Sequence, residues 1–193
     1  MRTIYSRLIV VLIVLVSCVG MAGAQGKPST WTPPPAIVKQ LAAPTSLGFA
    51  TVRLPKGIRL QRQKSREKGW DAWIGYGAGW GPVASYAVVS GKLTAEEAGT
   101  FNSQDITELS MIMLNADIYG LQLTAPESGR INGVAFTRVR WSGIDKELRT
   151  PMHGFVYTSI RGRQFTQIMS QQIERTRERL RFTDASALTF RLK

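Results

Sequence analysis

Few residues of this chain could carry out catalytic chemistry. Its 193 residues include one histidine, His153, and one cysteine, Cys18. Ser142 and Asp145 precede His153 on one loop and the strand after it, so a hydrolase that uses Ser142 and His153 is one hypothesis. However, no Gly-x-Ser-x-Gly turn frames any serine, and a lone histidine beside a glycine turn is more often structural. We therefore predict that the protein is not an enzyme, and the hydrolase stays an alternative.

Metal and nucleotide sites are not indicated by the residue types either. A zinc site needs three or four ligands, and the histidine and cysteine count is too low to supply them. The glycines of residues 70–81 never give Gly-x-Gly-x-x-Gly spacing. A calcium site needs clustered carboxylates, and the acids of the second half of the chain are scattered: Asp117, Glu127, Asp145 and Glu147. We expect no metal and no cofactor.

A basic stretch is the first candidate binding surface. The stretch, residues 53–68, contains a single acid, Glu67. Two interpretations are open: protection of an exposed strand edge, which we favour, or docking of an anionic polymer or lipid headgroups. Nucleic acid is not expected, because the basic residues lack the frame of a recognition helix and export removes the usual targets. The basic residues are Arg53, Lys56, Arg59, Arg62, Lys64, Arg66 and Lys68.

An aromatic stretch interleaved with glycines is the second candidate. Aromatic rings on flexible backbone can form a stacking platform for a ligand, although such rings more often cap a core, which is the interpretation that we favour. The platform residues would be Trp70, Trp73, Tyr76 and Trp80.

The N-terminal residues predict export. Arg2 and Arg7 precede an apolar run, Leu8–Val16, which is too short to span a bilayer, and a small-x-small cleavage pattern ends at Ala24. Residues 1–24 are therefore expected to be a signal peptide. Removal of its two arginines would lower the formal charge from +12 to +10, which favours anionic partners.

A second processing site stays open. Residues 15–18 resemble the lipobox of bacterial lipoproteins, in which the cysteine carries the lipid, so the signal would be residues 1–17 and Cys18 the anchor. In either case the protein is expected in the periplasm or outside the cell, without a disulfide in its domain. Its partner is expected to be an envelope protein that the sequence does not identify, with an anionic membrane surface as an alternative.

Residues 25–46 are rich in proline and predict an extended tether before a domain of residues 47–193. Prolines cannot propagate a helix or the interior of a sheet, and consecutive prolines favour polyproline geometry. Trp31 within the tether is a candidate to dock on the domain.

The domain itself is predicted to centre on a run of antiparallel strands. Asn132-Gly133 suits a two-residue hairpin turn, and strands are expected over Val134–Trp141, Gly154–Ile160 and Phe165–Ser170, with a loop at Ser142–Pro151. Val134 and Phe136 should face one side of the sheet, and Val139 and Trp141 the other.

Further strands and two helices complete the expected pattern. Strands are predicted at Ala50–Leu54, Ile58–Gln61 and Pro82–Ser90. Two capping boxes, Thr94 with Glu97 and Asn102 with Asp105, predict helix starts, and Gly120 a helix end. Ile173–Arg191 is predicted to be the last helix, which Phe182-Thr183-Asp184 could interrupt. The predicted fold class is α+β, with a mostly antiparallel sheet covered by helices.

This order of elements resembles the PsbP-like α/β/α sandwich over residues 47–193. The resemblance to exported bacterial members of unknown function is carried by Ile131-Asn132-Gly133, Arg140-Trp141-Ser142-Gly143, Met152-His153-Gly154-Phe155 and Leu188-Thr189-Phe190-Arg191. These motifs are turns and core positions, so they indicate a fold and transfer no catalytic residue. The resemblance implies a binding or assembly protein. Residues 70–81 have no counterpart in it.

Overall fold

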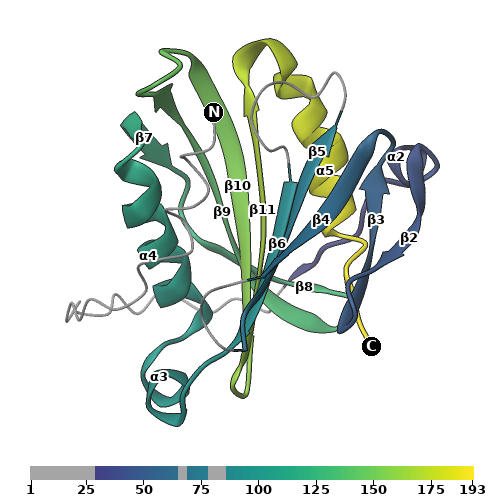
Figure 1. Ribbon diagram of the computed structural model, residues 1–193, viewed down its shortest axis with the longest axis vertical. Coiled ribbons are helices and arrows are strands. Elements are labelled where there is room, and N and C mark those ends of the chain that lie inside the picture. The colour runs from purple at the N-terminus through teal and green to yellow at the C-terminus, as the bar shows by residue number, and fades with distance from the viewer. Residues whose placement is uncertain (1–28, 65–68, 78–85) are drawn as a thin grey trace.

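The computed structural model describes residues 29–64, 69–77 and 86–193. A large sheet runs in the order β1-β8-β9-β10-β11-β6-β5-β4, with β7 beside β9 in line with β8 (Figure 1). Among the described strand pairs of this sheet, β1–β8 is parallel and the others are antiparallel. The strands are β1 (Ser29–Thr30), β4 (Ile58–Lys64), β5 (Asp71–Gly77), β6 (Tyr86–Lys92), β7 (Ile118–Leu123), β8 (Glu127–Ile131), β9 (Val134–Asp145), β10 (Pro151–Arg161) and β11 (Gln164–Ile173).

A second, smaller sheet and four short α-helices complete the described fold. The small sheet has the order β12-β3-β2, built from β2 (Leu41–Ser46), β3 (Ala50–Pro55) and β12 (Arg191–Leu192). The helices are α2 (Pro35–Val38), α3 (Ala95–Thr100), α4 (Ser103–Asn115) and α5 (Leu180–Ala187), and a 3-10 helix, η1 (Glu174–Arg179), leads into α5.

The two faces of the large sheet are covered differently. Helix α4 packs over β9 and β10 on one face, where Met111, Trp141 and Val156 form a small core. On the other face α5 and the small sheet enclose the main core, which includes Phe155 and Phe190. The mostly antiparallel sheet is as predicted, but the expected cover by helices is too broad, because much of the second face is covered by strands.

The predicted hairpins are confirmed where the signals are local. Asn132 and Gly133 have positive φ angles of 47° and 85°, as a type I′ turn requires. Phe136 lies in the main core and Val139 under α4, so the two faces alternate as expected. The loop predicted at Ser142–Pro151 is instead the end of β9, a tight turn and the start of β10. The turn is stabilised because the Asp145 carboxylate accepts hydrogen bonds from the amides of Glu147 and Leu148.

The extended tether predicted for residues 25–46 is wrong from Ser29 onward. This segment forms β1, α2 and β2, which belong to the folded unit. Its prolines occupy positions that tolerate them, because Pro35 opens α2 and Pro44 stands at a register shift of β2. Trp31 docks as predicted: its backbone N–H donates to the Arg130 carbonyl at 2.8 Å.

The helix boundaries predicted from capping residues are more accurate than those predicted from the spacing of apolar residues. Both capping boxes form, at Thr94 and at Asn102. Gly120 does not end α4, which stops at Asn115, and lies instead in β7 with a φ angle of 59°. The last helix is shorter than the predicted Ile173–Arg191, because β11 continues to Ile173, the 3-10 helix η1 follows it, and α5 ends at Ala187.

The Phe182-Thr183-Asp184 segment lies inside α5, so it does not interrupt the helix. Ile173 packs under α4 and Leu188 in the main core, on opposite faces of the sheet. One helical stripe could therefore not hold both residues.

Candidate functional site

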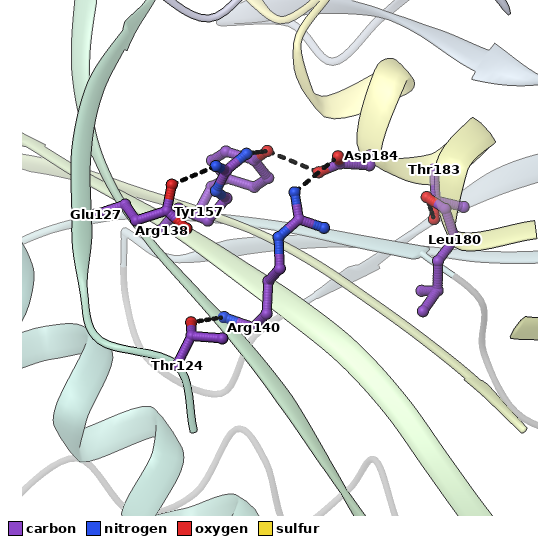
Figure 2. A network of polar contacts seen from close by, with 8 residues as sticks. All are labelled: Thr124, Glu127, Arg138, Arg140, Tyr157, Leu180, Thr183 and Asp184. Carbon is purple, nitrogen blue, oxygen red and sulfur yellow. Dashed lines mark hydrogen bonds and ion pairs between the residues drawn. The ribbon is translucent and has the colours of Figure 1, made fainter. Parts of the chain in front are cut away.

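A chain of polar side chains crosses the α5 face of the sheet (Figure 2). Arg138 on β9 donates to the Tyr157 hydroxyl at 3.1 Å and to Glu127 at 2.5 Å. Its guanidinium also stacks over the Trp31 ring, 4.6 Å from the centroid. Gly129 provides the room for this indole, since a Cβ there would lie 2.3 Å from Trp31. The network therefore holds the N-terminal segment against the sheet.

The same chain of contacts holds α5. The Tyr157 hydroxyl donates to Asp184 Oδ1 at 2.7 Å, and Arg140 Nη2 donates to the other carboxylate oxygen at 3.2 Å. On the same helix, Thr183 immediately precedes Asp184, and its hydroxyl accepts a hydrogen bond from Ser170 on β11 at 2.8 Å. Figure 2 shows Asp184 as the point where α5 meets β9 and β10. These contacts make the cluster a structural clamp.

The protonation states of the clamp suit a fixed scaffold. Burial, with Asp184 beside the hydroxyl, raises the pKa of Tyr157 far above its usual value. Burial opposes the charge of Arg138, but its hydrogen bonds to Tyr157 and Glu127 outweigh that cost and raise the pKa of the guanidinium. Tyr157 therefore remains a hydrogen-bond donor at all physiological pH values, and neither group is poised for proton transfer.

Alkaline pH is expected to destabilise the protein through two buried tyrosines. Burial raises the pKa of Tyr86 and of Tyr157, whereas in the unfolded chain both ionise near the usual value of about 10. Above that pH the unfolded state binds two fewer protons, so the free energy of unfolding should fall by up to about 2.7 kcal/mol per pH unit. Urea unfolding at a series of pH values from about 9 to about 11 measures this slope. Tyr157→Phe should halve it; an unchanged slope for Tyr157→Phe would contradict the assignment.

The residues proposed for hydrolysis do not converge. Ser142 and His153 are register partners on β9 and β10, but His153 Nε2 lies against the carboxylate of Glu174 on η1. Asp145 is buried beside Ile118 and is occupied by the amides of its own turn. Ser142, His153 and Asp145 therefore do not form a catalytic triad. Among the described residues, no three His, Cys, Asp or Glu side chains are grouped to hold a metal ion.

The basic stretch divides between the two sheets. Arg53 is a structural residue of the small sheet, where its guanidinium donates to the carbonyls of Leu41 and Ala42. Lys56, Arg59 and Arg62 are exposed on the β3–β4 turn and on β4, the edge strand of the large sheet. Arg62 forms an ion pair with Asp71 at 2.7 Å. This placement supports edge protection. Lys64 ends β4, and Arg66 and Lys68 lie outside the described residues.

The aromatic residues do not form one platform. Trp73 is buried in the main core, on the α5 face of the sheet. Trp70 lies on the α4 face, with its ring centroid 4.4 Å from that of Phe165. Tyr76 is exposed on β5, and Trp80, like Cys18 and Ala24, lies outside the described residues.

An apolar cavity beside α4 is too small to be a metabolite site. It has a volume of about 120 Å³, and Trp70, Ile74, Leu114 and Phe165 are among its lining residues. Ligand pockets usually measure about 300–1,000 Å³, whereas a cavity of roughly 150 Å³ holds only a benzene-sized molecule. We assign it to packing between α4 and the sheet.

Exposed apolar side chains gather at one end of the sheet. Tyr119 on β7 is the register partner of Ile144 on β9, and Ile144 is the partner of the exposed Pro151 on β10. Tyr119 is 51% exposed and Ile144 46%. Leu148, also exposed, lies in the adjoining β9–β10 turn, which Figure 1 shows at the same end of the molecule as β7. We call Tyr119, Ile144, Leu148 and Pro151 the apolar tip.

Two cations flank the apolar tip. Lys146 Nζ lies 5.0 Å from the centroid of the Tyr119 ring, and the Arg149 guanidinium lies 6.0 Å from it. Lys146 also donates to the Asn115 and Ala116 carbonyls, so it closes the C-terminal end of α4. Sequence reasoning missed this surface because Ile144 and Leu148 were assigned to a loop. Extending the alternation of β9 past Trp141 would have placed Ile144 on the same face as Arg138, Arg140 and Ser142, next to polar residues, where an isoleucine is unexpected.

These layers and this strand order define a PsbP-like fold, and comparison with solved structures agrees. Cyanobacterial PsbP (CyanoP) from Synechocystis sp. PCC 6803 is similar with a TM-score of 0.57 and 12% identity, over 90% of this chain and 98% of that one. LpqN, involved in cell envelope biogenesis of Mycobacterium tuberculosis, is similar with a TM-score of 0.50 and 13% identity, over 83% of this chain and 94% of that one. The Ran-binding protein Mog1p of Saccharomyces cerevisiae is similar with a TM-score of 0.50 and 8% identity, over 78% of this chain and 94% of that one.

At these identities the shared property is the fold. No protein-family model matches the sequence, and no curated protein is similar enough to count as a relative. Within the part of the chain that the structure describes, no helix is both long and apolar enough to cross a membrane.

Proposed function

We propose that the protein is a non-catalytic binding protein of PsbP-like fold that is exported and docks on a component of the cell envelope through the apolar tip. The observation that carries the proposal is the exposed row Tyr119–Ile144–Pro151 with Lys146 and Arg149 beside it. Exposed apolar side chains that cluster, rather than scatter, mark interaction surfaces.

The remaining chemistry of the fold supports binding over catalysis. The polar side chains of the α5 face are used to clamp α5 and the N-terminal segment, and His153 is held by Glu174. Two structural neighbours carry names that fit such a role, the Ran-binding Mog1p and LpqN with its part in envelope biogenesis. The signal segment of the sequence supports the location.

Site-specific photo-crosslinking in intact cells tests the proposal. A benzophenone amino acid at Leu148 should give an adduct with an envelope component. The same probe at Ile112, which is 65% exposed on α4, should give none. The adduct should disappear when Tyr119→Thr and Ile144→Thr are added, since threonine preserves strand propensity and removes the apolar surface. Equal crosslinking from Leu148 and Ile112 would argue against docking at the tip.

A further inference from the structure

The chemistry of the apolar tip suits a membrane–water interface. Tyr119 presents a ring with a polar end, Ile144 and Leu148 are aliphatic, and Lys146 and Arg149 lie at the border of the apolar surface. Tyrosine and long basic side chains are favoured at headgroup depth, where the apolar part enters the bilayer and the charge contacts phosphate. Glu147, exposed in the same turn, offsets part of this charge.

The size of the tip argues against a large protein interface. A stable protein complex uses about 20–30 residues on each side, whereas the tip has four apolar side chains and two flanking cations. Peripheral association with a bilayer needs only a few apolar side chains together with attraction to anionic lipids, above all when a second anchor is present.

The N-terminal end of the first described strand, β1, points toward the tip. β1 runs parallel to β8, with Ser29 opposite Gly129. β7 lies beside β9 immediately ahead of β8, so the start of β1 is directed toward β7. Because Ser29 and Gly129 are paired, the two chain lengths can be compared: Tyr119 lies ten residues before Gly129, and Cys18 lies eleven residues before Ser29. Eleven residues span at most about 36–40 Å, which is sufficient to bring a lipid on Cys18 level with the tip.

We infer that the apolar tip rests on the surface of an anionic phospholipid bilayer. This inference builds on the proposed docking function and names the partner of the same surface. Tyr119, Ile144 and Leu148 enter the headgroup region, and Arg149 contacts lipid phosphate. The signal-proximal chain and the tip then hold the domain in one orientation on the membrane.

Vesicle co-sedimentation tests the inference without the lipid anchor. The full gene carries Cys18→Ser, and the exported protein is purified after mass spectrometry has shown processing after Ala24. It should bind vesicles of phosphatidylglycerol and phosphatidylethanolamine. Tyr119→Thr with Ile144→Thr should lower the partition coefficient about tenfold. Arg149→Gln should lower it about fivefold on these vesicles and little on neutral phosphatidylcholine. The matched control, Ile112→Thr on α4, should bind like the parent.

The outcomes separate this inference from the proposed function. Absence of vesicle binding, or equal binding by the tip variant and Ile112→Thr, would overturn the membrane inference. If Leu148 then still crosslinks to an envelope protein in cells, the docking function stands with a protein partner. If Leu148 gives no adduct with lipid or protein, both fail.

Discussion

Gly154→Ala is expected to lower the free energy of unfolding by about 3 kcal/mol, because the substitution places an atom where none fits. A Cβ at Gly154 would lie 2.4 Å from the Trp141 ring and 2.5 Å from the Ser170 carbonyl oxygen. The ring packs under α4, and the carbonyl belongs to β11, so one obstacle is core and the other is backbone. β10 lies between β9 and β11 and cannot shift without breaking a ladder. Urea unfolding monitored by circular dichroism measures the loss.

The same substitution elsewhere provides the control. Gly99 lies in α3, and a Cβ there would meet no atom within 4 Å. Gly99→Ala is therefore expected to stabilise the protein, by about 0.5–1 kcal/mol, since alanine is the better helix former. If the two variants changed stability in the same direction, the steric explanation for Gly154 would be wrong.

Asp184→Ala is expected to lower the free energy of unfolding by about 2 kcal/mol, because it leaves the buried Tyr157 hydroxyl without an acceptor. The change removes the acceptor of the Tyr157 hydroxyl, which is buried, and the partner of Arg140. Arg138 would then be the remaining hydrogen-bond partner of Tyr157. Because Asp184 joins α5 to β9 and β10, amide hydrogen exchange should rise most in α5, before the centre of the sheet is affected.

A more exposed ion pair shows whether burial is the cause. Asp71 also pairs with an arginine, Arg62, but that guanidinium is 63% exposed. Asp71→Ala is therefore expected to cost less than about 1 kcal/mol. Asp184→Asn, which keeps an acceptor for Tyr157, should recover part of the loss. A result in which Asp71→Ala and Asp184→Ala cost the same would show that the clamp does not hold α5.

The parts of the fold that local chemistry specifies were predictable. The Asn132-Gly133 turn and the capping boxes at Thr94 and Asn102 depend on residues within four positions of each other. The alternation of Phe136 with Val139 and Trp141 predicted which side chains face each core. Such signals do not depend on distant parts of the chain.

The N-terminal segment was misassigned because its structure depends on remote partners. Residues 29–46 are rich in proline, and nothing near them in the sequence indicates a strand. β1 forms only against β8, and Trp31 is held by Arg138 and by the space at Gly129. The last helix was overextended for a related reason, because Ile173 pairs with Met152 of β10 as the end of β11 and the next residues form the 3-10 helix η1.

Among the described residues, neither set of candidate binding residues lies on one surface, whereas the residues of the apolar tip do. The basic residues divide between two sheets, and Trp70 and Trp73 lie on opposite faces of the large sheet. The tip joins residues of β7, β9 and β10 through strand register.

By itself the sequence determined the Asn132-Gly133 turn, the starts of α3 and α4 and the alternation of the central strands, because these depend on neighbouring residues. It also carried the resemblance to the PsbP-like fold, through turns and core positions. Only the tertiary structure decided that a proline-rich segment is part of the sheet, that Asp184 secures α5, and which apolar side chains meet at the surface. Those features depend on contacts between residues far apart in the chain, such as Trp31 with Arg138 and Tyr157 with Asp184, and sequence spacing carries no information about such distances.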